Sequence, residues 1–456
     1  MTTFKLNDDI LYLIFKPFQD NKTTLYSCLL VNKNWCKIII PILWGNPWKG
    51  LKVEKKKSLL NVIISHLSED SKNNLDQKIQ RPLFNYITFC KHLNFDEIVN
   101  IIDRLYDISK IPIIKNEIVN LFINENTKFT HLYLPRQFDY QLHIIPGAKN
   151  CFSELGFISC NTNINDDVLD GLIEICEPIK ELELFIDKDY NYRFVKLIKA
   201  IKRLSNFRLL GENYSVKNDE FCEIIENSLI QHGETIQCFK TTVHSAMKVF
   251  SSFVNLKRLE LDNSIGITMT LENVSLPFLQ ILKAKKVSIK DLTNLIENTS
   301  GYLTVIKINR GDYNEVNNKR IIQVIYQNCP KLKCLKLEIM NDNILELNQL
   351  SINCQYLNEL YILDYYYGWV NFDWNNTFEI LTKSSPINLF KFGFSKFSLP
   401  DLESLKLFFD NWKGRHPMIL KSDWYDDAND YIELIEKYKA KGIVKKIFKK
   451  SRWWNF

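Results

Sequence analysis

A short apolar pattern returns along most of this chain of 456 residues and restricts the folds that the chain can adopt. The pattern is apolar-x-x-apolar-x-apolar, and it first stands out at Phe129, Leu132 and Leu134. Its copies have a mean period of about 26 residues, which is enough for one strand and one helix each. The further copies are Phe152, Leu155 and Phe157; Ile179, Leu182 and Leu184; Leu204, Phe207 and Leu209; Ile236 and Phe239; Leu256, Leu259 and Leu261; Leu279 and Leu282; Leu303, Ile306 and Ile308; Leu332, Leu335 and Leu337; Leu357, Leu360 and Ile362; and Ile387, Phe390 and Phe392.

The alternation at the end of each copy predicts a short strand with its apolar side facing inward. Helical patterns separate the copies, as in residues 166–175. One strand and one helix cannot bury both of their apolar faces alone, so the repeats have to stack. The pattern therefore predicts an α/β solenoid, with a parallel strand ribbon on the concave face and helices outside.

Cysteines recur at one place in several copies. Residues 329–337 read CPKLKCLKL, residues 176–184 read CEPIKELEL, and Cys354 precedes Leu357 by three positions. This pattern resembles the leucine-rich repeat, and in particular its cysteine-containing subclass. We interpret these cysteines as small buried side chains, not as metal ligands or nucleophiles. Because the copies differ in length, we expect an irregular solenoid.

The first 44 residues have a different, helical pattern. Asn7 is a suitable N-cap, and Asp8 and Asp9 place negative charge in the first turn of a helix. Asn32 can cap a third helix, and Pro41 is expected to end it. The apolar positions of the three helices are Ile10, Leu11, Ile14, Phe15 and Phe18; Leu25, Cys28 and Leu29; and Trp35, Ile38 and Ile39. Three short helices cannot bury all this surface alone, so some of it should meet a partner or the next domain.

From Leu6 to Trp44, this segment resembles an F-box, the three-helix segment that docks on the Skp adaptor of a cullin ubiquitin ligase. One departure is Asn7, where the family usually has a proline that touches the adaptor, so a weaker contact is expected. An alternative is an ordinary helical lobe that packs on its own chain. The resemblance implies that the adaptor-binding residues are Leu6, Asn7, Ile10, Leu11, Ile14, Leu29, Val31 and Trp35.

These patterns divide the chain into four parts: an F-box (1–49), a helical connector with a capping unit (50–128), the solenoid (129–400) and a C-terminal capping unit with a basic tail (401–456). In the connector, we expect helices near residues 59–67 and 95–106 and a first strand within 82–89. In the last part, we expect a helix from 402 to 412, a strand at 418–420, a helix over 427–439 and a last strand at 443–444.

Catalytic and metal-binding motifs are missing from the sequence. It contains no phosphate-binding loop, no zinc-protease motif and no nucleophile elbow, and its seven histidines do not stand at metal-ligand spacing. We therefore expect no enzyme activity, no cofactor and no metal. Eleven scattered cysteines fit reduced thiols in the cytoplasm or nucleus. The first twenty residues do not resemble a signal peptide, and no apolar run is long enough to span a membrane.

Binding is the function that remains. Residues between the inward positions of each strand should face the concave surface, and their charges have mixed signs. The aromatic run at residues 365–369 (YYYGW), together with Trp374, follows one strand and forms a candidate contact loop, unless these residues pack on the next repeat. The candidate substrate-binding residues are Arg258, Glu260, Lys307, Lys336, Tyr361, Tyr366 and Trp369.

The combined resemblance implies a substrate-recognition subunit of a Skp–cullin–F-box ubiquitin ligase, whose solenoid holds a target protein. Its expected partners are a Skp-family adaptor, a cullin bound through that adaptor, and the target. One alternative is an interaction scaffold with a degenerate F-box. Another is a nucleic-acid binder that uses the basic tail; the net charge of +6 is mild for a chain of this length, so neither nucleic acid nor a membrane is an expected partner.

Overall fold

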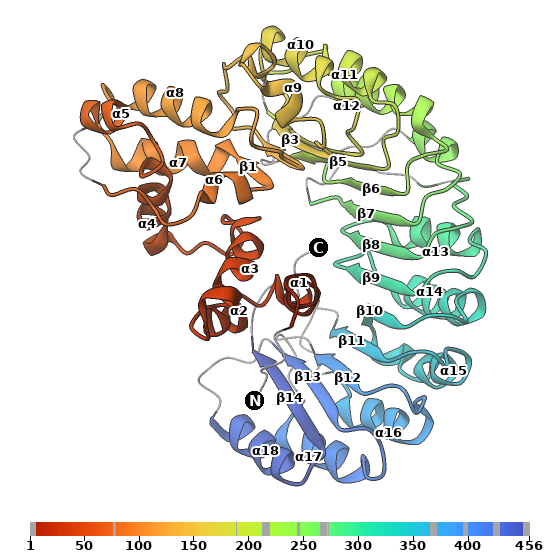
Figure 1. The fold of residues 1–456 in the computed structure, drawn as a ribbon. Coiled ribbons are helices and arrows are strands. Elements are labelled where there is room, and N and C mark those ends of the chain that lie inside the picture. Colours follow the sequence, from red (N-terminus) through yellow and green to blue (C-terminus); the bar gives the residue numbers. More distant parts are fainter. Residues whose placement is uncertain are drawn as a thin grey trace. The chain divides into compact units, whose positions relative to one another are not determined.

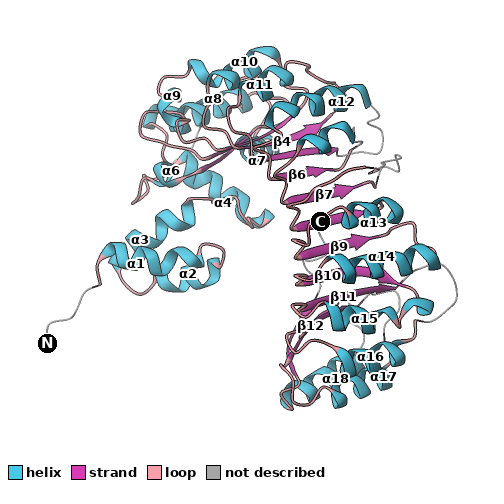
Figure 2. Ribbon diagram, turned by 90° about the vertical axis from the view of Figure 1, so that its right-hand side faces the viewer, coloured by secondary structure: helices cyan, strands magenta, loops and turns pink. Residues whose placement is uncertain are grey.

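The computed structural model describes residues 6–75, 79–187, 189–211, 219–243, 247–264, 271, 273–364, 372–394, 400–422 and 429–449. The chain forms two compact units, Met1–Leu204 and Ser205–Phe456. Figure 1 shows the elements of both units, and Figure 2 shows them from the side. Among the described residues, no helix is both long enough and apolar enough to cross a lipid bilayer.

The first unit begins with helices and continues into a parallel ribbon. β1 pairs with β2, β2 with β3, and β3 with β4, always in parallel. The strands are β1 (His92–Asn94), β2 (His131–Tyr133), β3 (Phe157–Asn161) and β4 (Glu181–Ile186). The helices are α1 (Asp8–Phe15), α2 (Lys22–Leu29), α3 (Lys33–Trp44), α4 (Val53–Ile64), α5 (Glu69–Asn74), α6 (Tyr86–Phe89), α7 (Phe95–Leu105), α8 (Ile111–Phe122), α9 (Ala148–Cys151), α10 (Asp166–Glu174) and α11 (Phe194–Ala200).

Among its described residues, the second unit contains ten strands, and a helical or looped return leads from each to the next. Each strand pairs in parallel with the next one in the sequence. The strands are β5 (Asn206–Gly211), β6 (Cys238–Thr241), β7 (Arg258–Asp262), β8 (Ile281–Lys285), β9 (Val305–Asn309), β10 (Cys334–Ile339), β11 (Glu359–Asp364), β12 (Lys391–Phe394), β13 (Met418–Ser422) and β14 (Val444–Lys449). The helices are α12 (Asp219–Ser228), α13 (Ile289–Glu297), α14 (Glu315–Asn328), α15 (Glu346–Asn353), α16 (Trp374–Ser384), α17 (Leu402–Asn411) and α18 (Asn429–Ala440).

These parallel ribbons with helical returns confirm the predicted α/β leucine-rich repeat solenoid. In the second unit, helices α13 to α17 lie on one face of the strands (Figure 1). We call the opposite face of the strands the open face. The predicted C-terminal helix, strand, helix and strand are confirmed as α17, β13, α18 and β14.

The repeat core is built from the inward positions of the motif. Leu335 of β10 is paired with Leu360 of β11 and with Ile306 of β9, and each of the three is at most 1% exposed. The cysteines are confirmed as buried packing residues: the Cys354 thiol contacts the carbonyl oxygen of Cys329 at 3.8 Å. Burial raises the pKa of the Cys354 thiol to about 12, so it stays protonated and unreactive at neutral pH.

Two copies of the motif have a different register from the predicted one. At β3, the strand pairing places Ile158 beside Leu132 and Leu182, so the inward residues are Leu155, Ile158 and Cys160, and the prediction of Phe157 is wrong. At β12, the inward residues are Leu389, Phe392 and Phe394, whereas Ile387 is 70% exposed. Both segments contain adjacent apolar residues, so two registers satisfy the pattern and only pairing with the neighbouring strands selects one.

The first strand of the ribbon is β1, and the strand expected within residues 82–89 is absent. Residues 86–89 form the short helix α6 instead. The side chain of His66 accepts a hydrogen bond from the Tyr86 amide at 3.1 Å, which replaces a bond that a neighbouring strand would supply. The helices expected near residues 59–67 and 95–106 are confirmed as α4 and α7.

Candidate functional site

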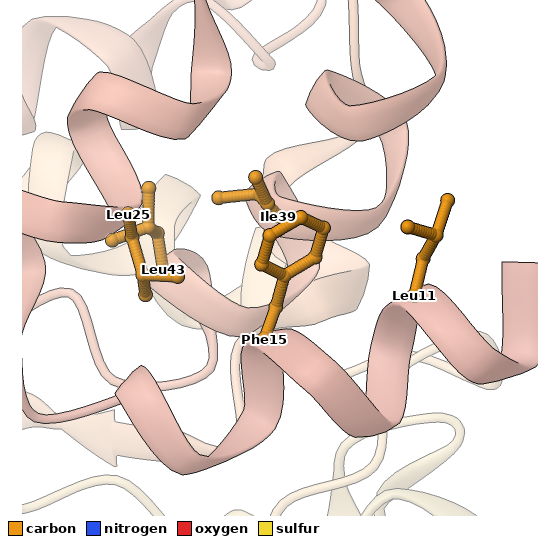
Figure 3. Packing of buried hydrophobic residues seen from close by; sticks show 5 residues of the cluster. All are labelled: Leu11, Phe15, Leu25, Ile39 and Leu43. Atoms are coloured by element: carbon orange, nitrogen blue, oxygen red, sulfur yellow. The ribbon is translucent and has the colours of Figure 1, made fainter. Parts of the chain in front are cut away.

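Helices α1, α2 and α3 form a lobe with a small core of its own (Figure 3). We call residues 6–44 the three-helix lobe. Its buried cluster consists of Leu11, Phe15, Leu25, Ile39 and Leu43. Trp35 is partly buried and packs its ring edge-on against Phe15, with the ring centroids 4.9 Å apart. The predicted role of Trp35, which is to tie the third helix to the core, fits this contact.

Asparagine side chains start all three helices of the lobe. Asn7 accepts a hydrogen bond from the Asp9 amide at 3.4 Å, and Asn32 accepts one from the Trp35 amide at 2.9 Å. Both predicted N-caps are therefore confirmed. Asn21 caps α2 in the same way through the Thr24 amide at 3.3 Å. The caps fix where each helix begins, and with it the direction in which each apolar stripe faces.

Pro41 does not end the third helix, contrary to the prediction. The helix continues to Trp44, with Pro41 inside it. A proline costs the helix one hydrogen bond. However, Ile39 and Leu43 are buried on either side of it, and the Gly45 amide donates to the Pro41 carbonyl at 2.9 Å. Burial of these side chains outweighs the missing bond.

The lobe leaves a large part of its apolar surface uncovered. On α1, Ile10 and Ile14 lie one turn apart and are 48% and 44% exposed, and Leu13 beside them is 69% exposed. After α2, Leu30 and Val31 are 88% and 56% exposed. Monomeric proteins rarely leave adjoining large apolar side chains in water unless they meet a partner. This surface is the candidate docking face of the lobe.

The eight residues predicted to bind the adaptor do not all lie on this surface. Five of them are exposed at its surface, whereas Leu29 and Trp35 are partly buried against the lobe core. Leu11 is 3% exposed and supports the lobe from inside, so its side chain offers no contact surface. The exposed ones are Leu6, Asn7, Ile10, Ile14 and Val31. Sequence reasoning missed Leu13 and Leu30, although Leu13 stands at helical spacing from Ile10.

The lobe is joined to the ribbon of the first unit by a few defined contacts. Trp44 stacks on Tyr86 with ring centroids 4.4 Å apart. The indole nitrogen of Trp48 donates to the His92 carbonyl at 2.7 Å, at the start of β1. The Lys91 amide donates to the Gly45 carbonyl at 2.9 Å. The end of α3 is thus attached directly to the first strand of the ribbon.

The open face of the second unit carries the predicted substrate-binding residues that lie in strands. Glu260 of β7 is 5% exposed and sits among three cations: Lys283 at 2.8 Å, Arg258 at 2.5 Å and Lys240 at 3.8 Å. Burial alone would raise the pKa of Glu260, but Lys283 and Arg258 outweigh it and hold the pKa below its usual range. Glu260 is therefore a fixed anion that organises its neighbours.

Tyr361 of β11 belongs to a second ion cluster on the same face. Its hydroxyl donates to Glu359 at 3.1 Å and contacts the Lys421 amine. Glu359 also pairs with Lys391 at 2.5 Å. The ring lies over Gly393 of β12, where an added Cβ would be 2.1 Å from a ring carbon, so any side chain at that position would displace it. Tyr366 and Trp369, the other aromatic candidates, lie outside the described residues.

Strands β1 to β3 of the first unit carry a group of aromatic side chains at their outward positions. His92 of β1 and His131 of β2 are stacked with ring centroids 3.8 Å apart, and the ring centroids of Tyr133 and Phe157 are 5.1 Å apart. Burial, aided by the nearby His131 and Lys49, lowers the pKa of His92 to about 4. Both imidazoles therefore favour the neutral form at physiological pH. Within the described part of the chain, no group of three or more metal-ligating side chains occurs.

No family model matches the chain, and no curated protein sequence matches it. Among solved structures, the crystal structure of the leucine-rich repeat-containing protein LegL7 from Legionella pneumophila is similar at 12% sequence identity, with a TM-score of 0.35. The similar region covers 63% of this chain and 88% of that protein.

Proposed function

We propose that this protein is the substrate-recognition subunit of a Skp–cullin–F-box ubiquitin ligase. The observation that carries the proposal is the uncovered apolar face of the three-helix lobe, in a segment whose sequence resembles an F-box. A lobe that has its own core and still exposes Ile10, Ile14 and Leu13 needs a partner to cover them. The Skp adaptor is the partner that the resemblance implies.

In this function the chain performs no bond chemistry. The exposed lobe residues Leu6, Ile10, Ile14 and Val31 would contact the adaptor, with Asn7 at the rim and Leu11, Leu29 and Trp35 supporting them from within. The adaptor would connect the chain to a cullin, and the open face of the repeats would hold the target protein. The gain is proximity, which raises the effective concentration of target lysines near the ubiquitin thioester. The complex would act in the cytoplasm or nucleus.

The alternative function is an interaction scaffold whose lobe does not bind the adaptor. Asn7 favours this alternative, because an F-box usually presents a proline at that position. As Asn7 is exposed and only caps α1, its replacement of the proline removes one rim contact and leaves the apolar face of Ile10 and Ile14 unchanged. For this reason we favour adaptor binding over the scaffold.

Co-purification of the full-length chain with the Skp adaptor tests the proposal. We expect the wild type to bind, and Ile10→Glu/Ile14→Glu to lose binding because two charges would be buried at the interface. These positions suit the test because both side chains are exposed in the chain itself, whereas Leu11→Glu would place a charge in the lobe core.

The matched control is Val316→Glu/Leu345→Glu, which changes two apolar residues that are 78% and 70% exposed in the second unit. This control should bind the adaptor like the wild type. Failure of the wild type to bind would favour the scaffold and reject the ligase subunit. Equal binding by both double variants would reject the assigned docking face.

A further inference from the structure

Exposed aromatic residues recur at one position of the repeats in the second unit. Phe278, Tyr302 and Tyr356 each stand directly before the first inward leucine of a repeat and three residues before the start of its strand. They are 47%, 41% and 61% exposed. In the repeat between the last two, the same position holds Lys331, which is also exposed. We call these four residues the aromatic edge.

The aromatic edge follows the order of the strands. Strand pairing aligns the first residues of β8, β9, β10 and β11, which are consecutive in the ribbon (Figure 1). The rings of Phe278 and Tyr302 are neighbours, with centroids 6.1 Å apart. The amine of Lys331 lies 4.7 Å from the centroid of the Tyr302 ring. The four residues therefore form one row along the edge at which the strands begin.

Backbone hydrogen bonds hold this edge in place. Two residues after each edge position, the amide of one repeat donates to a carbonyl oxygen of the repeat before it. Thr304 donates to Gln280 at 2.8 Å, Lys333 to Thr304 at 2.8 Å, and Asn358 to Lys333 at 2.9 Å. Because these bonds extend the strand pairing towards the edge, the backbone that carries the rings is already ordered. A ligand would bind there at a small cost in backbone entropy.

The row offers apolar surface together with hydrogen-bond donors. Within the part of the chain that the structure describes, no protein group is hydrogen-bonded to the hydroxyl of Tyr302 or of Tyr356. Tyrosine combines an apolar ring with a polar tip that can donate. The surface therefore suits a ligand that is largely apolar but carries carbonyl acceptors.

The backbone segments that form the edge are basic. They contain two exposed lysines, Lys331 and Lys333, and no acidic residue. The acidic residues that border the segments, Glu297 and Glu359, form ion pairs within the chain. An anionic group at the lysines would therefore be attracted. The segments are residues 275–280, 299–304, 328–333 and 353–358.

We infer that the aromatic edge binds a proline-rich segment of a partner protein, in polyproline II conformation and with acidic residues between its prolines. A polyproline II helix rises about 3.1 Å per residue with three residues per turn, so prolines three positions apart are about 9.3 Å apart on one side. Tyr302 and Tyr356 are two strand spacings apart, or about 9.6 Å. One turn of the segment therefore spans the two tyrosines.

Each part of the edge has a counterpart in such a segment. The prolines pack on the rings, and the carbonyl oxygens, which have no hydrogen bonds within a polyproline II helix, accept from the tyrosine hydroxyls. A carboxylate between the prolines reaches Lys331. The inference goes beyond the proposed function, because the aromatic edge is separate from both the lobe and the open face.

A single-stranded nucleic acid fits this edge less well. Its bases could stack on the rings, but it carries a phosphate at every nucleotide and requires a basic groove along its backbone. The edge segments contain only two lysines, which match a few carboxylates.

Fluorescence anisotropy with the full-length chain tests the inference. The probe is a labelled synthetic peptide with three copies of Pro-Pro-Glu between Gly-Ser flanks. We expect the wild type to bind it and Tyr302→Ala/Tyr356→Ala to weaken binding by at least about tenfold, because two exposed ring contacts are removed. Tyr302→Phe/Tyr356→Phe keeps the rings and should bind more tightly than the alanine variant. The control Tyr192→Ala, at a tyrosine of the first unit that is 49% exposed, should have no effect.

Two changes of the probe separate the contacts. A peptide with Ala in place of Pro should lose binding, because it lacks both the rings' partners and the ordered conformation. A peptide with Gln in place of Glu should bind more weakly, and Lys331→Glu should weaken binding of the Glu peptide more than that of the Gln peptide. Equal binding of the Ala peptide, or unchanged binding by the alanine variant, would overturn the inference. So would binding of an oligothymidylate without binding of the proline-rich peptide.

Adaptor co-purification on the same preparations separates this inference from the proposed function. If the adaptor binds but the proline-rich peptide does not, the inference is wrong and the proposed function stands. If the peptide binds but the adaptor does not, the proposed function is wrong and the inference stands. Tyr302→Ala/Tyr356→Ala should leave adaptor binding unchanged, since both tyrosines lie outside the lobe.

Discussion

In the three-helix lobe, Ile10 and Leu13 are 48% and 69% exposed, whereas Leu335 and Leu337 of β10 are each 1% exposed. The residue types are alike, but their surroundings differ. A repeat covers the apolar side of its strand with its own helix and with the repeats on either side. The described residues contain no second copy of the lobe on which it could stack, so its outer face stays open. This exposure is the reason for proposing that the lobe binds a partner.

The largest effect should come from the repeat core. We expect Leu335→Ala to destabilise the second unit by about 3 kcal/mol, because it leaves a cavity between three adjacent strands. Urea unfolding measures this free energy. Leu345→Ala, at a position that is 70% exposed, should change it by less than about 0.5 kcal/mol. A small effect of Leu335→Ala would show that the repeats accommodate a cavity at this position without a large loss of stability.

Helix capping provides a smaller comparison between the same regions. Asn32 caps α3 of the lobe. Asn314 caps α14 of a repeat, and its own amide also donates a hydrogen bond to the Asn317 side chain. We expect each Asn→Ala change to cost about 1 kcal/mol locally. Hydrogen exchange should show faster exchange of α3 amides for Asn32→Ala and of α14 amides for Asn314→Ala. Spread of either effect to the other helix would mean that the lobe and the repeats unfold together.

The docking face of the lobe should contribute almost nothing to stability. We expect Ile10→Glu/Ile14→Glu to change the free energy of unfolding by no more than about 0.5 kcal/mol, because both positions lie at the surface and about half of each side chain is already in water. Leu11→Glu is the contrasting variant and should unfold the lobe, since Leu11 is 3% exposed. Circular dichroism melts distinguish them. A large loss from the double variant would mean that this face is covered in the free protein.

The last comparison depends on pH and concerns β1, where the end of the lobe meets the ribbon. The pKa of His92 is lowered to about 4, mainly by burial and then by His131 and Lys49, so the folded state disfavours its protonation. The contribution of neutral His92 to the free energy of unfolding should be fully present above the unfolded pKa of roughly 6.5. It should be lost as the pH falls from there towards about 4. Urea midpoints measured at successive pH values should follow this slope. His92→Phe keeps an aromatic ring and should reduce the dependence of the urea midpoint on pH. An unchanged pH dependence would assign the effect to other groups.

Much of the repeat architecture was predictable, and the failures have definite causes. The strands at Leu335 and Leu360 were correctly placed because only one register of their segments is apolar. The segments near Phe157 and Phe390 contain apolar residues in two registers, and only the neighbouring strands resolve them. Pro41 was expected to end a helix, because the sequence does not show that Ile39 and Leu43 are buried together.

The candidate sites were predictable to a smaller extent. Spacing located Ile10 and Ile14 on one helix face but did not separate exposed Ile10 from buried Leu11, since the two are adjacent on the helix. The open face was expected to carry mixed charges, which is correct for the full set of outward residues. The sequence did not predict that Lys283, Lys307 and Lys336 lie side by side, because this depends on the register between strands.

The sequence by itself determined the periodic elements: the apolar repeat, the helix caps at Asn7 and Asn32, and the small buried cysteines. These depend on local backbone preferences and on a period that one chain segment contains. Only the tertiary structure decided which apolar residues stay exposed and which charges become neighbours. Burial and electrostatic interaction depend on distances across strands and helices, and residues far apart in the sequence set those distances.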